Sequence, residues 1–325
     1  MIDMSFTRIY ISMAFVAMIL VALTSGCISD DGEEAYAEVD REGTLPLDIE
    51  KMAPEDDLYP PMLHDDSFEQ PIPLPYPLNT SGAEDSPFIL PDGNTLYFFF
   101  TPDVRVSPQE QLLDGVTGVW ASKREEGTWS VPERVWLQDP GKLSLDGAVS
   151  IYDGEMFFAS AREGYEGMNI FTAEYDGEHW TNWQYAGDRL MREIMVGEVH
   201  LQGDQLYFHS DRPGGFGGYD IWLTTRGGDS WTDPLNISVV NTEDMDGFPF
   251  ISPDGNELWF TRGYMGSPAV YRSVREGDEW GEPELIVSQF AGEPTLDEDG
   301  NLYFVHHFYV DGAMVEADIY VAYRK

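Results

Sequence analysis

The stretch DGFPFISPDGNELWF (Asp246–Phe260) holds two short apolar runs on either side of Ser252-Pro253-Asp254-Gly255. Both runs are rich in aromatic and aliphatic residues and have the length of β-strands. The Asp-Gly pair supplies the positive φ that a tight hairpin turn needs. The stretch therefore predicts a β-hairpin.

The same hairpin pattern occurs five times along the chain. The second strand of each copy carries the same signature: Leu96-Tyr97-Phe98, Met156-Phe157-Phe158, Leu206-Tyr207-Phe208, Leu258-Trp259-Phe260 and Leu302-Tyr303-Phe304. A third strand follows, and a tryptophan beside a Gly-containing turn marks a fourth strand in four copies: Trp129, Trp180, Trp231 and Trp280. Four strands recurring about every 46 to 60 residues are typical of propeller blades, because one twisted sheet covers its faces only when neighbours pack against it. We expect an all-β fold, a single five-bladed β-propeller of four-stranded antiparallel blades.

The fifth copy reaches Lys325 directly after its third strand. The segment Pro71–Asn79 precedes the first copy much as Pro234–Ile237 precedes the fourth. We expect this N-terminal segment to supply the missing strand, which would close the ring and remove an exposed sheet edge.

The stretch FHSDRPGGFGGYDIW (Phe208–Trp222) resembles the repeat of TolB-type, WD-like β-propellers, and so does the turn Ser252–Gly255. The resemblance covers roughly residues 70–325. It implies a propeller fold that is commonly extracytoplasmic and serves as a protein- or ligand-binding scaffold, and it implies no single activity. The sequence departs from the pattern at an insertion, Val104–Gly115, and at His306-His307, which replaces a serine-containing turn.

Residues 1–26 have the layout of a secretory signal peptide, with Arg8 before an apolar run from Ile9 to Leu23. Cys27 follows in Leu23-Thr24-Ser25-Gly26-Cys27, which resembles a lipoprotein lipobox and implies that its thiol carries a lipid. The alternatives are an ordinary signal or an uncleaved anchor. Residues 27–67 are acidic and rich in proline, so we expect a disordered tether there and the propeller at 68–325.

The composition limits the partners. Asp and Glu number 59 against 18 Lys and Arg, a net charge of −41, so nucleic acid would be repelled. Cys27 is the only cysteine, which leaves no intramolecular disulfide. We expect a monomer outside the cytoplasm, held at the cell membrane by its N-terminal lipid or anchor, with a protein or glycan partner in the cell envelope.

Acidic residues recur near the start of the first strand of each copy: Glu84, Asp85, Asp146, Glu198, Asp246 and Glu293. First strands line the central channel of a propeller, so these carboxylates would gather at one mouth, raise one another's pKa or bind a cation. Calcium is the cofactor that such oxygen ligands favour. The alternative is a structural role, in which each carboxylate accepts hydrogen bonds from a neighbouring turn.

Phe216 and Tyr219, in and beside the Gly-rich loop Pro213–Gly218, are further binding candidates, because loops on a rigid scaffold often carry binding residues. The four recurring tryptophans fit packing better than a sugar-stacking platform. Arg162 and Arg212 occupy equivalent positions, and we expect each to pair with an acid of its own blade.

The sequence thus favours an extracytoplasmic, membrane-anchored binding or scaffolding module without a catalytic motif. The alternative is a carbohydrate-active hydrolase that uses two carboxylates at the channel mouth, an interpretation that rests on fold analogy. A hydrolase would lose turnover when either acid is removed, whereas a binder would lose affinity when the loop Pro213–Gly218 is changed.

Overall fold

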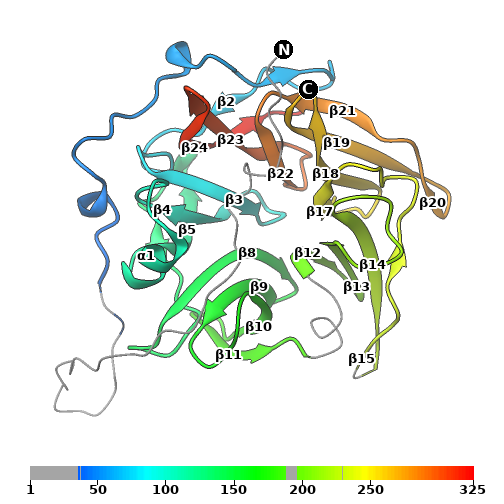
Figure 1. Ribbon diagram of the computed structural model, residues 1–325, viewed down its shortest axis with the longest axis horizontal. Helices are drawn as coiled ribbons and strands as arrows, with labels where there is room; N and C mark the ends of the chain where they lie inside the picture. The colour runs from blue at the N-terminus through cyan, green and yellow to red at the C-terminus, as the bar shows by residue number, and fades with distance from the viewer. Residues whose placement is uncertain (1–35, 37, 188–195, 229) are drawn as a thin grey trace.

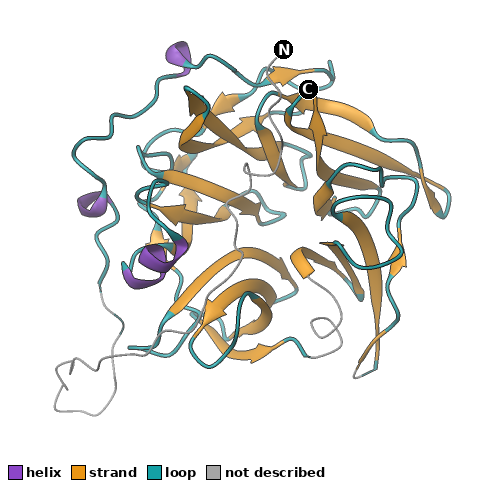
Figure 2. Cartoon of the chain, in the orientation of Figure 1, coloured by secondary structure: helices purple, strands orange, loops and turns teal. Residues whose placement is uncertain are grey.

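The computed structural model describes residues 36, 38–187, 196–228 and 230–325, and this part of the chain is almost entirely β-structure. Its sheets are arranged around a common centre (Figure 1), which is consistent with a β-propeller. Five inner strands lie nearest to that centre: β3 (Ala83–Ile89), β8 (Ser144–Tyr152), β12 (Val196–Gln202), β17 (Asp246–Ile251) and β22 (Ala291–Leu296). Helical segments lie at the periphery (Figure 2): η1 (Glu42–Thr44), η2 (Pro54–Asp56) and α1 (Pro108–Leu113), the last within the predicted insertion.

Each inner strand forms an antiparallel hairpin with a second strand. The second strands are β4 (Thr95–Thr101), β9 (Glu155–Arg162), β13 (Gln205–Ser210), β18 (Glu257–Tyr264) and β23 (Leu302–Val310). A third antiparallel strand follows: β5 (Gly118–Glu125), β10 (Asn169–Tyr175), β14 (Asp220–Gly227), β19 (Ser267–Glu276) and β24 (Ala313–Ala322). The hairpins and third strands expected from the repeats are therefore confirmed.

Whether the outermost strand is continuous depends on proline. Where a proline follows the repeated tryptophan, the strand is split into two short pieces: β6 (Thr128–Trp129) and β7 (Glu133–Arg134), β15 (Ser230–Trp231) and β16 (Leu235–Asn236), β20 (Glu279–Trp280) and β21 (Glu284–Ser288). The copy that lacks the proline keeps one continuous strand, β11 (Trp180–Tyr185). Proline has no N–H to donate to a sheet, which explains the interruption.

The repeated tryptophans pack between sheets. Trp180 meets the ring of Tyr97 edge-on at 6.4 Å, and Trp231 and Trp280 meet Phe157 and Tyr207 of their preceding hairpins at 6.1 and 6.4 Å. Trp129 lies in the same apolar cluster as Tyr303, so it joins the first and last copies. The packing interpretation of these tryptophans is confirmed.

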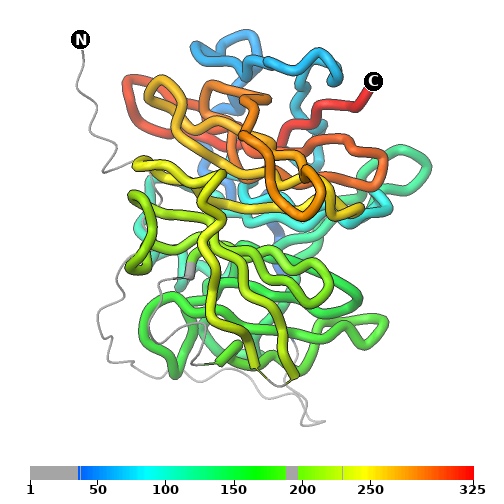
Figure 3. The backbone as a smooth tube through the Cα atoms, turned by 90° about the vertical axis from the view of Figure 1, so that its right-hand side faces the viewer, coloured from blue at the N-terminus to red at the C-terminus, as the bar shows by residue number. Residues whose placement is uncertain are grey.

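The N-terminal segment pairs with the last copy. β2 (Ile72–Pro73) lies antiparallel to β24, with Ile72 opposite Val321, and Phe68 bridges to Arg324. Figures 1 and 3 show these blue and red ends of the chain side by side. A parallel contact between Ala317 and Ala83 joins β24 to β3, whereas the described sheets do not merge into one closed sheet.

The structure corrects the expected disorder for residues 38–67 of the predicted tether. From residue 38 onward individual side chains anchor the described chain to the sheets: Arg41 is buried, and Lys51 pairs with Glu316 and Asp318. β1 (Met62–Leu63) adds a strand to β21. The sequence did not predict these contacts because each contact depends on a single side chain, whereas the prediction relied on proline content, acidic composition and the absence of an apolar period. The predicted signal peptide, Cys27 and the start of the predicted tether lie outside the described residues.

Within the described part of the chain, no helix combines the length and the apolar character that crossing a bilayer requires.

Candidate functional site

Each inner strand carries a β-bulge at its start. The pairing register shifts between Asp85 and Phe88, Gly147 and Ser150, Val196 and Val199, Gly247 and Phe250, and Gly292 and Thr295. Four of the residues in these bulges have left-handed backbone angles although they are not glycine: Ser86 (φ 45°), Ala148 (51°), Phe248 (55°) and Glu293 (53°). Such angles cost on the order of 1 kcal/mol each, and this strain often occurs at binding sites.

The bulge residues line a central cavity of about 30 Å³. Ser86, Ala148, Glu198, Phe248 and Glu293 contribute one side chain from each inner strand, and all five are half-buried. A second layer closes the axis, because His200 lies 4.4 Å from Phe250 and 6.0 Å from Phe88, measured between ring centroids. The rings of Phe88, His200 and Phe250 therefore form one wall of the cavity.

Two of the predicted carboxylates, Glu198 and Glu293, line this cavity together, and Asp85 adjoins them. The Ser86 hydroxyl lies between the two glutamates, with Oγ 2.6 Å from Glu293 and 3.4 Å from Glu198. His307 Nε2 lies 3.6 Å from Asp85. We call Asp85, Ser86, Glu198, Glu293 and His307 the channel-mouth cluster.

The electrostatics of the channel-mouth cluster favour neutral glutamates. Burial and then the nearby Asp85 charge raise the pKa of Glu198 to about 8, and the same causes raise the pKa of Glu293 well above its ordinary value. Burial lowers the pKa of His307, but the charge and hydrogen bond of Asp85, the charge of Glu293 and a backbone hydrogen bond to Phe290 together outweigh it, so the net shift is upward. His307 therefore faces the charge of Asp85, while burial and that charge favour the protonated form of both glutamates.

The other three predicted carboxylates, Glu84, Asp146 and Asp246, lie outside the cavity lining and are buried in ion pairs. Asp146 pairs with Arg162 at 2.9 Å, and Asp246 pairs with Arg262 of the equivalent hairpin. The structural interpretation fits these three acids.

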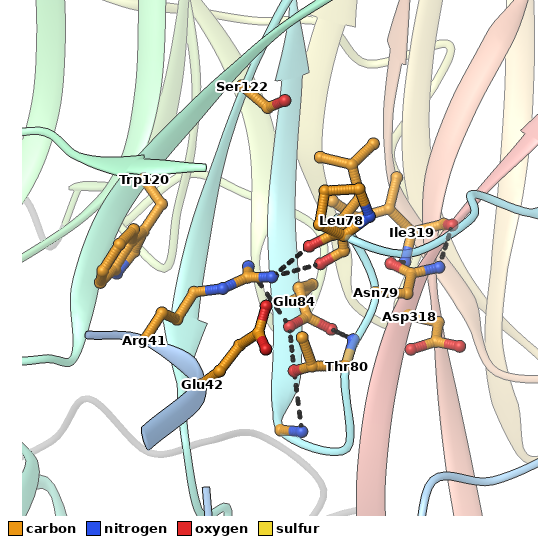
Figure 4. Close-up of polar contacts among 12 residues, drawn as sticks. Arg41, Glu42, Leu78, Asn79, Thr80, Glu84, Trp120, Ser122, Asp318 and Ile319 are labelled. Atoms are coloured by element: carbon orange, nitrogen blue, oxygen red, sulfur yellow. Dashed lines mark hydrogen bonds and ion pairs between the residues drawn. The ribbon is translucent and has the colours of Figure 1, made fainter. Parts of the chain in front are cut away.

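Glu84 obtains its cation from the N-terminal segment instead. Arg41 Nη1 lies 3.6 Å from Glu84, and the hydroxyl of Thr80 donates to the same carboxylate at 2.6 Å (Figure 4). Burial nevertheless raises the pKa of Glu84 to about 7, since burial outweighs Arg41. The six acids that were expected to form one ring therefore form two sets. Asp85, Glu198 and Glu293 come one or two positions later in their inner strands than Glu84, Asp146 and Asp246 do.

The predicted arginines and rim aromatics also have defined places. Arg162 pairs within its own sheet, as expected, and Arg212 lies over the ring of Trp222 at 4.8 Å. Phe216 is 54% exposed. Tyr219 packs on His209 at 4.9 Å, and His209 in turn contacts Phe248 of the cavity at 4.9 Å. Tyr219 is therefore linked to the cavity lining through His209.

Sequence reasoning missed His200, His307 and Ser86 as site residues. His200 lies two places after Glu198 and Ser86 one place after Asp85, whereas His307 is adjacent to none of the recurring acids. His306 and His307 are neighbours in β23 and face opposite sides of the strand, since His306 binds Asp57 at 2.8 Å whereas His307 lies against Asp85. Among the described residues, no three His, Cys, Asp or Glu side chains have the geometry of a metal site, so the structure lends the expected calcium no support.

The comparisons with known proteins concern the fold alone. No protein-family model matches the chain, and no curated protein matches its sequence. Among solved structures it is similar to TolB from Acinetobacter baumannii (14% identity, TM-score 0.41, 75% of this chain and 55% of that one) and to Bacteroides ovatus xyloglucan PUL GH43B (14%, 0.48, 77% and 53%). It is also similar to an α-L-arabinofuranosidase from Lactobacillus brevis (14%, 0.48, 76% and 92%). The chain spans about half the length of the first two proteins.

Proposed function

We propose that this chain is an extracytoplasmic, membrane-anchored β-propeller of five blades that binds a protein or glycan partner in the cell envelope. Five hairpins with equivalent bulges around one cavity support the blade count. The pairing of β2 with β24 supports closure of the ring by the N-terminal segment. The signal-like residues 1–26 and the lipobox-like Cys27 support the location.

The small volume of the central cavity favours binding over hydrolysis. A glycosidase must hold a sugar between two carboxylates that stand about 5 to 9.5 Å apart. Here the Ser86 hydroxyl already occupies the space between Glu198 and Glu293, and the cavity of about 30 Å³ is far below the roughly 300 Å³ of a small-molecule pocket. A partner would therefore be recognised mainly by the surface around the mouth.

The hydrolase alternative has one observation in its favour. Glu198, with its pKa raised to about 8, would be protonated at neutral pH, as a general acid must be. Reaching a glycosidic oxygen would require the Ser86 side chain and the bulges around it to move.

The deciding experiment compares two sets of variants of the full chain. We expect Phe216→Ala and Tyr219→Ala to reduce capture of an envelope partner or an immobilised glycan at least tenfold, while Tyr152→Ala, an exposed tyrosine on another strand, leaves it unchanged. We expect no turnover of aryl glycosides. If the chain does hydrolyse an aryl glycoside, and if Glu198→Gln and Glu293→Gln each abolish that turnover, the hydrolase interpretation would replace the binding role.

A further inference from the structure

A second and larger cavity lies between the N-terminal segment and the last sheet. Its volume is about 370 Å³, which is within the range of small-molecule pockets, whereas the central cavity measures about 30 Å³. One wall comes from residues 41–54, which we call the strap, and the other comes from residues 73–81 and β24. Figure 4 labels Glu42 of the strap and two residues of the opposite wall, Thr80 and Asp318. The cavity therefore exists only while the strap lies against the sheets.

The walls of this cavity are largely apolar. Six of its twelve lining residues are apolar or aromatic: Leu45, Met52, Pro54, Pro73, Leu74 and Tyr76. Leu74 is 4% exposed and belongs to an apolar cluster against which Leu45 also packs, so both walls have a fixed base. At the roughly 30 Å³ that a water molecule takes in the liquid, the cavity has room for about a dozen non-hydrogen atoms. This volume exceeds that of any single side chain, which favours a free small molecule as the occupant.

The three charged side chains of the lining already have partners. Lys51 donates to both carboxyl oxygens of Asp318, at 2.6 and 2.5 Å, and also pairs with Glu316. The hydroxyl of Tyr76 donates to Glu42 at 2.6 Å. A charged group on a ligand would lose its hydration without gaining an unpaired counter-ion, which is costly. The lining therefore favours an uncharged ligand.

Ser81 adds a polar group that suits such a ligand. It is half-buried in the same lining, and a hydroxyl can both donate and accept a hydrogen bond. We propose that the cavity under the strap binds a small uncharged molecule with an aromatic or alicyclic body and a hydroxyl group. Such a ligand contacts both walls at once, so its binding holds the strap against β24. This site shares no lining residue with the central cavity, and the proposal does not depend on the partner proposed above.

The first test compares three compounds of nearly equal size on the full chain by calorimetry. These are 1-naphthalenemethanol, 1-naphthylmethylamine and 1-naphthoate, which at neutral pH are uncharged, cationic and anionic. We expect the alcohol to bind at least tenfold more tightly than either ion. Failure of the alcohol to bind would overturn the proposal. Equal or tighter binding of an ion would overturn the assignment to an uncharged ligand.

Variants locate the binding site. Leu45→Ala removes part of the apolar wall and should weaken binding of 1-naphthalenemethanol at least fivefold. Leu47→Ala is the matched control, because Leu47 lies on the same strap and is fully exposed. Ser81→Trp fills the cavity from the opposite wall and should abolish binding. Circular dichroism checks the folding of each variant, and unchanged affinity in both folded cavity variants would refute the site.

Proteolysis tests the contact with the strap. Saturating 1-naphthalenemethanol should slow tryptic cleavage of the native chain at Lys51 at least threefold, because the bound form must open before the protease can act. Cleavage at Lys142, in an exposed ion pair away from the strap, is the internal control and should not change. Equal slowing at both sites would refute the link between ligand and strap. Capture of the envelope partner by the Phe216 and Tyr219 variants is a separate measurement, so either proposal can fail alone.

Discussion

Glu198 makes stability depend on pH. Its pKa rises from an unfolded value near 4.3 to about 8 in the folded chain, so the folded state holds a proton that the unfolded state has lost over that interval. The raised pKa values of Glu293 and His307 act with the same sign. The buried neutral residues His200 and His209 oppose it only below about pH 6.5, where they would charge on unfolding.

We therefore expect stability to fall as the pH rises from 7 to 8.5. The loss attributable to Glu198 is on the order of 1 kcal/mol, or about 2 to 4 °C in melting temperature. Thermal unfolding of the native chain and of Glu198→Gln at matched ionic strength measures it. The variant should show a flatter profile, and parallel profiles for the two proteins would contradict the assigned cause.

Asp146 and Arg162 form a buried pair, with side chains only 1% and 3% exposed. Arg162→Met would leave the Asp146 charge buried without its partner, so we expect a loss of roughly 3 kcal/mol in the free energy of unfolding. Lys142→Met is the matched control, because Lys142 and Glu163 form an exposed pair that should contribute less than about 1 kcal/mol. Chemical denaturation measures both variants, and equal losses would refute the distinction.

At the same scale, the sequence located the acids but not their grouping. Recurrence once per copy identified Glu84, Asp146, Glu198, Asp246 and Glu293, yet the bulges place Glu198 and Glu293 in the cavity lining and leave the other three outside it. A bulge depends on local backbone geometry that an aligned pattern of residue types does not encode. The role of His200 could not be seen because it depends on Phe88 and Phe250 of other copies.

At the scale of elements, hairpins were predictable because their turns and apolar runs are local. The course of residues 38–67 was not, since individual side chains, scattered along this segment, hold it against the sheets. Arg41 lies over the rings of Phe98 and Phe100, and Asp57 binds His306. These contacts join residues more than fifty positions apart, and no periodicity in the sequence predicts them.

The anchored segment should resist proteolysis. Trypsin cleaves extended, accessible backbone, so we expect cleavage at Lys142, which is exposed in a turn, at least tenfold faster than at Arg41 or Lys51. A time course of limited digestion followed by mass spectrometry measures the rates. Lys51→Ala should speed cleavage at Arg41, because it releases the segment from Glu316 and Asp318. Rapid early cleavage at both Arg41 and Lys51 of the native chain would instead support the disordered tether that the sequence predicted.

At the scale of the whole molecule, a net charge of −41 opposes compaction. The described cations are mostly committed to specific partners: Arg41 and Arg162 each pair with a buried acid, and Arg124 and Arg275 lie over Trp129 and Trp280. Excess carboxylates on the surface therefore repel one another with little local compensation. Composition alone predicts this feature, because it requires no knowledge of the fold.

Salt should consequently stabilise the protein. The Debye length shrinks from roughly 14 Å at 0.05 M to about 3 Å at 1 M, which removes most repulsion between surface carboxylates, whereas buried pairs such as Asp146–Arg162 are screened much less. We expect the melting temperature to rise by several degrees as potassium chloride increases from 0.05 to 1 M, with sodium and tetramethylammonium chloride giving the same rise. A flat or falling curve would show that attractive surface pairs outweigh repulsion. A rise confined to one cation would indicate specific binding in place of screening.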